Sequence, residues 1–142
     1  MNNEDLIKFR DTAHLPLDAG EYADDLIDIL NRIPDGWGKW ISCGPGWSKL
    51  LAETNSKMRH LSPNYEIHQV KEKFGTLRFY WGGHGGHPIT INIMDDIVYA
   101  AESKSAYICE ECGKYGELRT GGWWIKTLCG THAEEQGYLV EE

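Results

Sequence analysis

The sequence of 142 residues contains no apolar run that approaches the roughly 18 residues of a membrane-spanning helix. Its first residues, MNNEDLIKFRDTAHL, are polar and acidic and lack the apolar stretch of a signal peptide. Cysteine is scarce, with four in the chain, and a chain of this length can bury a core without disulfides. We therefore expect a cytoplasmic protein with reduced cysteines and no membrane partner.

Familiar catalytic motifs are missing as well. The sequence has no P-loop, no nucleophile elbow, no HExxH pair and no paired-acid motif. His84 and His87 lie in the glycine-rich segment GGHGGHP, where no acidic residue completes an acid–base site. Cys43 stands alone before Trp47, and burial as a small apolar residue is its simplest interpretation. We expect a protein that is not an enzyme, and catalysis by His84, His87 or Cys43 is the third alternative.

Positive charge is in deficit, with 14 lysines and arginines against 22 acidic residues and a net charge of −8. An acidic chain is repelled by phosphate backbones, which disfavours nonspecific binding of nucleic acid. The deficit is uneven, because residues 1–35 carry three basic and nine acidic residues, whereas residues 57–81 carry five basic and two acidic residues. Residues 57–81, with their excess of positive charge, are the part of the chain to which this repulsion does not apply.

Hydrophobic periodicity predicts an α+β fold. Apolar residues recur at helical spacing in three stretches, residues 21–33, 47–61 and 91–104. Alternation in residues 65–81, YEIHQVKEKFGTLRFYW, predicts two strands joined at the KEKFG bend, where Gly75 supplies backbone freedom. Residues 36–46 are expected to form a loop.

The segment CEECGKYGELRTGGWWIKTLCGTH, residues 109–132, carries the strongest motif in the chain. Cys109 and Cys112 form a C-x2-C pair, and Cys129 and His132 form a C-x2-H pair. Thiolates and imidazole are the ligands of closed tetrahedral zinc sites, and four protein ligands leave no position for a catalytic water. We predict a structural Zn²⁺. A thioredoxin-like redox pair does not fit, because these cysteines do not lie in a βαβ unit.

The residues around the two ligand pairs complete a small module. GELRTGGWWIKTL predicts a short hairpin around Gly121 and Gly122, and THAEEQGYL after Cys129 can open a helix. A knuckle, a hairpin and ligands at a helix start are the layout of a treble clef or zinc ribbon. We predict a helix-and-hairpin α+β domain over residues 1–105 and a zinc-binding C-terminal module over residues 106–142.

Two surfaces compete for a binding role. The first is the outer face of the helix predicted at residues 21–33, which carries Asp24, Asp25 and Asp28. Such a face is usually solvated surface, but it can also mimic a row of phosphates for a basic partner. Because the C-terminal module carries three basic and seven acidic residues, it is also poorly suited to DNA and better suited to docking a protein.

The second surface is the hairpin, in which Lys71, Lys73 and Arg78 are interleaved with aromatic residues. Charge combined with aromatic stacking suits single-stranded nucleic acid. The same pattern also fits a half-buried hairpin with a solvated basic edge, because strands are rich in aromatic residues.

Several blocks resemble a family of small uncharacterised proteins found in bacterial, phage and prophage genomes. The similarity covers roughly residues 44–133, and its specific parts are KEKFGTLRFY and CxxCG…TLCxxH. The resemblance implies the fold and the zinc but no reaction. It suggests phage or mobile-element biology, in which small acidic proteins often bind a host complex, an argument from analogy alone.

These observations lead to two functional expectations. The first is a non-enzymatic zinc-binding protein that acts by protein–protein interaction, as an anti-CRISPR-like phage inhibitor of a host nucleic-acid-processing or defence complex. The alternative is a nucleic-acid-binding zinc protein that uses Lys71, Lys73 and Arg78.

Overall fold

The computed structural model describes residues 20–82, 86–122 and 124–138, which form helices and two small sheets and confirm the α+β class. The helical segments are η1 (Gly20–Tyr22), α2 (Ala23–Asn31), η2 (Pro45–Trp47), α3 (Ser48–Leu61), α4 (Pro88–Ser105) and α5 (Gly130–Glu135). The strands are β1 (Ile41–Ser42), β2 (Glu66–Lys73), β3 (Thr76–Gly82), β4 (Glu117–Arg119) and β5 (Lys126–Leu128). Within these ranges, none of the helices has both the length and the apolarity of a membrane span.

The main sheet has the order β1-β2-β3 and contains the predicted hairpin. β2 and β3 pair in antiparallel fashion and meet at a two-residue turn, Phe74 and Gly75, with φ values of 54° and 85°. Two central residues with positive φ are the conformation of the tight turn that matches the twist of a hairpin. The KEKFG bend therefore turns at Phe74 and Gly75.

The expectation of a loop throughout residues 36–46 is wrong at Ile41–Ser42. This pair of residues forms β1, which runs parallel to β2 with Ile41 opposite Val70. Two residues are too few to show alternation, and the strand exists because Ile41 is fully buried in the core beside β2. α3 is therefore the crossover helix of a β1–α3–β2 unit.

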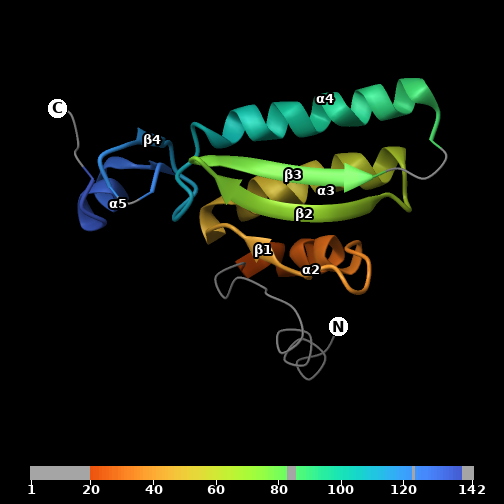
Figure 1. Ribbon diagram of the computed structural model, residues 1–142, viewed down its shortest axis with the longest axis horizontal. Coiled ribbons are helices and arrows are strands. Elements are labelled where there is room, and N and C mark those ends of the chain that lie inside the picture. Colours follow the sequence, from red (N-terminus) through yellow and green to blue (C-terminus); the bar gives the residue numbers. More distant parts are fainter. Residues whose placement is uncertain (1–19, 83–85, 123, 139–142) are drawn as a thin grey trace.

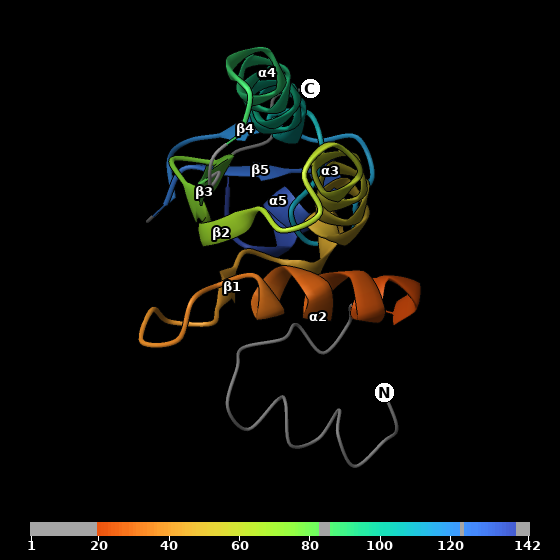
Figure 2. The same ribbon diagram turned by 90° about the vertical axis from the view of Figure 1, so that its right-hand side faces the viewer.

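Helices surround the main sheet unevenly. α3 lies behind β2 and β3, while α4 and α2 run along the two opposite sides (Figures 1 and 2). The buried core between these elements includes large side chains from η2, α3 and both long strands: Trp47, Met58, Ile67 and Phe79. The face of β2 and β3 that points away from α3 is not covered by any helix of the described ranges, and we call it the open face.

α4 begins earlier than the predicted start at residue 91. Pro88 occupies the first position of the helix, where the missing backbone N–H of proline is not needed. The Nδ1 atom of His87 accepts a hydrogen bond of 3.2 Å from the backbone N–H of Ile89 and caps the helix.

Side chains of α4 also accept hydrogen bonds from backbone N–H groups at the outer edge of β3. The backbone N–H of Leu77 donates to Ser105 Oγ at 2.8 Å, and the backbone N–H of Phe79 donates to Glu102 Oε2 at 2.9 Å. These bonds fix α4 along β3, and α4 then leads directly into the C-terminal module at one end of the molecule (Figure 1).

The C-terminal module consists of a knuckle, the β4–β5 hairpin and α5, in the order expected for a treble clef. It is bonded to the loop before α3. The backbone N–H groups of Gly44 and Gly46 donate to the Glu110 side chain and carbonyl at 2.8 and 2.7 Å, and Trp47 Nε1 donates to the Ile108 carbonyl at 2.9 Å. A Cβ atom at position 46 would lie 2.1 Å from the Cys109 carbonyl oxygen, so only glycine allows this close approach.

Candidate metal centre and open face

The four predicted ligands come together at the end of the C-terminal module. The ligand atoms of Cys109, Cys112, Cys129 and His132 all lie within 4.8 Å of one another. The Sγ atoms of Cys112 and Cys129 are 3.8 Å apart, and His132 Nδ1 lies 3.2 Å from Cys129 Sγ and 3.6 Å from Cys109 Sγ. Sulfur atoms bound tetrahedrally at 2.3 Å would be separated by about 3.7 Å. The cluster therefore suits one metal ion.

Backbone turns position the two ligand pairs. In the knuckle, the Cys109 N–H donates to the Lys114 carbonyl at 2.7 Å and the Gly113 N–H donates to the Cys109 carbonyl at 2.9 Å. Gly113 has a φ of 79°, which residues with a Cβ rarely adopt. At the second pair, Cys129 caps α5, and its sulfur accepts from the His132 N–H at 3.5 Å.

The surroundings of the cluster shift the pKa values of two of its thiols and place a carboxylate near its histidine. The backbone N–H of His132 stabilises the Cys129 thiolate and lowers the pKa of this thiol to about 6. For Cys112, partial burial and the neighbouring thiols raise the pKa. His132 Nε2, the nitrogen that faces away from the sulfur atoms, lies 3.9 Å from Glu135 Oε2. A carboxylate hydrogen-bonded to this nitrogen orients a metal-bound histidine, and at 3.9 Å Glu135 is close to this position but not bonded.

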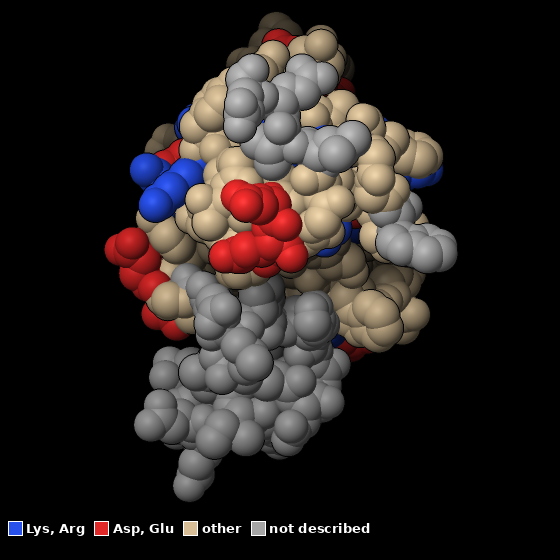
Figure 3. All heavy atoms as spheres, turned by 90° about the vertical axis from the view of Figure 1, so that its left-hand side faces the viewer, with Lys and Arg blue, Asp and Glu red and all other residues tan. Residues whose placement is uncertain are grey.

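The end of the molecule around the cluster is not basic. Figure 3 views this end and shows acidic side chains gathered near the middle of the face, among residues that carry no charge. The exposed residues Glu134 and Glu135 of α5 contribute to its negative charge. This end is therefore a poor surface for phosphate groups.

The open face of the main sheet has the opposite character. Lys71 on β2 lies directly opposite Arg78 on β3, and Ser42 of β1 pairs with Lys71 on its other side. Gln69 lies opposite Tyr80, whose side chain is 46% exposed. Because side chains alternate along a strand and Val70 points into the core, these residues project from the open face.

The three predicted basic residues of the hairpin have no acidic partner within residues 20–82, 86–122 and 124–138. Among the residues that the structure describes, no ion pair involves Lys71, Lys73 or Arg78. Arg78 Nε is enclosed and has no hydrogen-bond partner within the same ranges. Two like charges directly opposite each other destabilise a sheet, so the Lys71–Arg78 pair is costly to the free protein.

Two tryptophans extend the open face, and the sequence analysis did not assign them a role. Trp40 is 61% exposed and by alternation projects on the side opposite to buried Ile41. The Trp37 ring is 50% exposed and lies 4.6 Å, centroid to centroid, from the His68 ring on β2. The signal for these residues was weak, because only the pairing of β1 with β2 brings residues 37–40 beside the hairpin.

The acidic face of α2 is smaller than its sequence suggested. Asp24 is exposed and Asp25 is partly exposed. Asp28 Oδ2, however, accepts a hydrogen bond of 2.9 Å from Arg32 Nε at the end of α2 and one of 2.7 Å from Asn55 Nδ2, which joins α2 to α3. Burial alone would raise the pKa of Asp28, but the hydrogen bonds from Asn55 and Arg32 prevail and lower it. Asp28 is thus bonded to α3, although its side chain remains 34% exposed.

Of the residues considered for catalysis, the structure describes His87 and Cys43, which belong to different parts of the fold. His87 caps α4, and His84 lies outside the described residues. Cys43 packs against the core, and burial, with smaller effects of Glu110 and Glu72, raises the pKa of its thiol far above the ordinary value. A protonated, partly buried thiol is a poor nucleophile.

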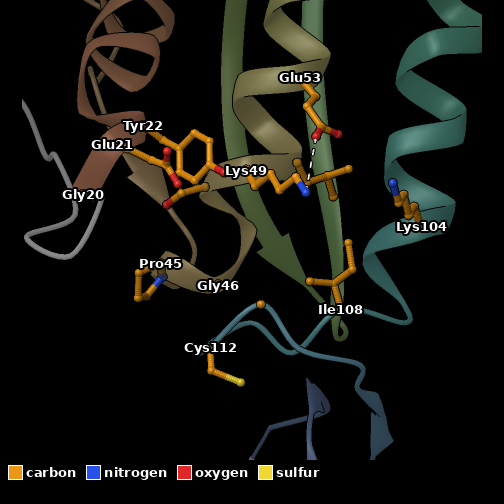
Figure 4. A pocket seen from close by; sticks show the side chains of 13 residues that line it. Gly20, Glu21, Tyr22, Pro45, Gly46, Lys49, Glu53, Lys104, Ile108 and Cys112 are labelled. Carbon is orange, nitrogen blue, oxygen red and sulfur yellow. Dashed lines mark ion pairs between the residues drawn. The ribbon is translucent and has the colours of Figure 1, made fainter.

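A pocket of about 570 Å³ lies between η1, the start of α3 and the knuckle. Figure 4 shows Lys49 paired with Glu53, at 3.9 Å, and Lys104 reaching in from α4. The charges in its lining are mixed. The two enclosed, unpartnered polar atoms of the described chain belong to Arg78 and Glu110, which do not line it. The pocket therefore shows no built site for a ligand.

Comparison of this chain with protein-family models, with curated proteins and with solved structures finds no match. The site is therefore interpreted from its own geometry.

Proposed function

We propose that this chain is a non-enzymatic, zinc-stabilised protein that binds single-stranded nucleic acid on its open face. The observation that carries the proposal is the Lys71–Arg78 pair, two cations held side by side with no acidic partner in the described ranges. An arrangement that destabilises the free sheet becomes favourable when it binds phosphate groups.

Exposed aromatic rings beside these cations support a single strand as the ligand. Trp40 and Tyr80 flank Gln69, because the register places Gln69 opposite Tyr80 and next to β1. Unpaired bases can stack on exposed rings, whereas the bases of a duplex are already stacked on each other. The basic side chains project from β2 and β3, whereas the exposed acidic residues Glu134 and Glu135 belong to α5. The net charge of −8 therefore does not describe the surface that would meet the ligand.

Zinc is the ion that best fits the metal centre. Three thiolates and one imidazole nitrogen form a soft, closed tetrahedral ligand set, typical of structural zinc. Glu110 follows the ligand Cys109 in the chain and holds the loop before α3. In the proposed function, the ion therefore stabilises the end of the molecule against which α3 and the hairpin are packed.

The test is binding of a fluorescein-labelled 20-residue oligodeoxythymidine, measured by fluorescence anisotropy at several salt concentrations. Three phosphate contacts predict a slope of about −2 for the logarithm of affinity against the logarithm of salt. The double variant Lys71→Glu/Arg78→Glu should bind far more weakly, and each lost contact should reduce the slope by about 0.7. A duplex of the same length should bind less tightly than the single strand.

The matched control is Lys57→Glu/Arg59→Glu on α3, which makes the same change of charge at two exposed positions behind the sheet. If both double variants lose affinity equally, the binding is nonspecific electrostatics and the proposed face is wrong. If the wild-type protein binds no single strand at low salt, the function itself is wrong. Binding of a host protein through Asp24 and Asp25 stays a prediction, and it would gain support from that second outcome.

A further inference from the structure

Phe74 occupies a position that suits it poorly. It is the only non-glycine residue with a positive φ in the described ranges, at 54°. The first central residue of this kind of turn is usually Asn, Asp or Gly, because a large side chain is strained in the left-handed region. The chain therefore accepts backbone strain in order to have phenylalanine at the tip of its hairpin.

Packing of the Phe74 side chain in the free protein does not offset this backbone strain. The Phe74 side chain is 64% exposed, although it is one of only three phenylalanines in the sequence. The adjacent Gly75 is buried against the C-terminal module, where a Cβ atom would lie 2.4 Å from Leu118 Cδ1. The turn is thus a joint between the sheet and the module, and its glycine is the packed residue. The aromatic ring is left in solvent.

The ring stands at the end of the open face. The Nζ atom of Lys73, which projects from that face, lies 5.5 Å from the centroid of the Phe74 ring. Next to Phe74 in the turn, Gly75 lies beside Ile125, which is 38% exposed, and beside the backbone of Lys126 on β5. Figure 1 shows the tip of the hairpin directed toward the C-terminal module. An aromatic ring beside a lysine side chain fits a base followed by a phosphate group.

The tip is also held rigidly. The Gly75 N–H donates to Glu72 Oε1 at 2.8 Å, and Thr127 Oγ1 donates to the Gly75 carbonyl at 2.6 Å. Thr127 is fully buried in the C-terminal module. A ring presented on a fixed turn loses little conformational entropy when a ligand covers it.

We propose that Phe74 stacks on an unpaired base where a strand bound to the open face leaves the sheet toward the C-terminal module. This inference rests on the proposed function and adds to it a binding residue outside the basic cluster. It also explains why a strained residue occupies the turn, since the benefit appears only in the complex.

The experiment replaces Phe74 by Asn, which suits the left-handed conformation and removes the ring. Phe74→Asn should raise the midpoint of urea unfolding while weakening binding of the labelled oligodeoxythymidine by about fivefold or more. Phe74→Trp, which keeps an aromatic surface, should retain binding within about twofold. Opposite signs for stability and affinity would separate a binding role from a structural one.

The outcomes of this test differ from those of the test of the open face. If Lys71→Glu/Arg78→Glu abolishes binding and Phe74→Asn leaves the affinity unchanged, the strand does not pass over the tip and this inference alone is wrong. If Phe74→Asn destabilises the protein, Phe74 serves the fold and the inference is also wrong. Ultraviolet cross-linking to oligouridine should place a cross-link in the peptide that contains residue 74 in the wild-type protein.

Discussion

Asp28 shows how a residue with the sequence pattern of a surface position can also form a hydrogen bond that joins two helices. Helical spacing places it on or beside the outer face with Asp24 and Asp25, where its side chain is 34% exposed. Asp28 also accepts a hydrogen bond from fully buried Asn55. The sequence could not reveal this bond, because the two residues are 27 positions apart. Asn55 contributed nothing to the apolar pattern from which the helix at residues 47–61 was predicted.

Asp28→Ala should therefore lower the free energy of unfolding by about 1–3 kcal/mol, since Asn55 and Arg32 lose their shared acceptor. Asp24→Ala should change it by less than about 0.5 kcal/mol. The pKa of Asp28 is lowered in the folded protein, so its contribution is present above the usual value of 3.8 and is lost as the pH falls through the lower, folded value. Urea unfolding of wild type and Asp28→Ala at neutral and strongly acidic pH checks both claims, and a stability difference that does not shrink in acid would contradict the second.

At the scale of elements, long periodic segments were predictable and short ones were not. The helices at residues 21–33, 47–61 and 91–104 and the KEKFG hairpin follow from local patterns, and the structure confirms them with shifted ends. β1 has two residues and depends entirely on its neighbour β2. Only part of the open face was therefore predictable from the sequence. Its lysines and arginine belong to the predicted hairpin, whereas its tryptophans belong to the segment around β1.

The metal ligands were predictable because the geometry of a tetrahedral site imposes a spacing on the chain. Cys112→Ser should remove zinc from the purified protein and expose the amides of residues 106–138 to hydrogen exchange, because metal binding and folding are coupled in small modules. Elemental analysis should find one zinc per wild-type chain. Cys43→Ser, which changes a cysteine outside the cluster, should keep the metal. A wild-type protein isolated without chelators and free of zinc would contradict the assignment.

At the scale of the whole molecule, the described elements form one connected body with an acidic C-terminal end and a basic open face on the main sheet. The bonds from Gly44, Gly46 and Trp47 to the segment 108–110 tie the C-terminal module to the α+β domain. A boundary at residue 105 therefore separates two parts of the sequence that share an extensive contact. Loss of the metal should consequently also destabilise the loop that carries residues 43–47, which lies outside the module.

The bonds between α4 and β3 have a consequence for solubility. An edge strand with free N–H groups is a template on which another chain can add a strand, and β-sheet proteins must block this route to aggregation. Ser105 and Glu102 occupy the N–H groups of Leu77 and Phe79, so they close this edge. The double variant Glu102→Ala/Ser105→Ala should leave α4 intact but form thioflavin-binding aggregates at concentrations where the wild-type protein stays monodisperse by light scattering. Two polar side chains would then be what keeps this sheet at three strands.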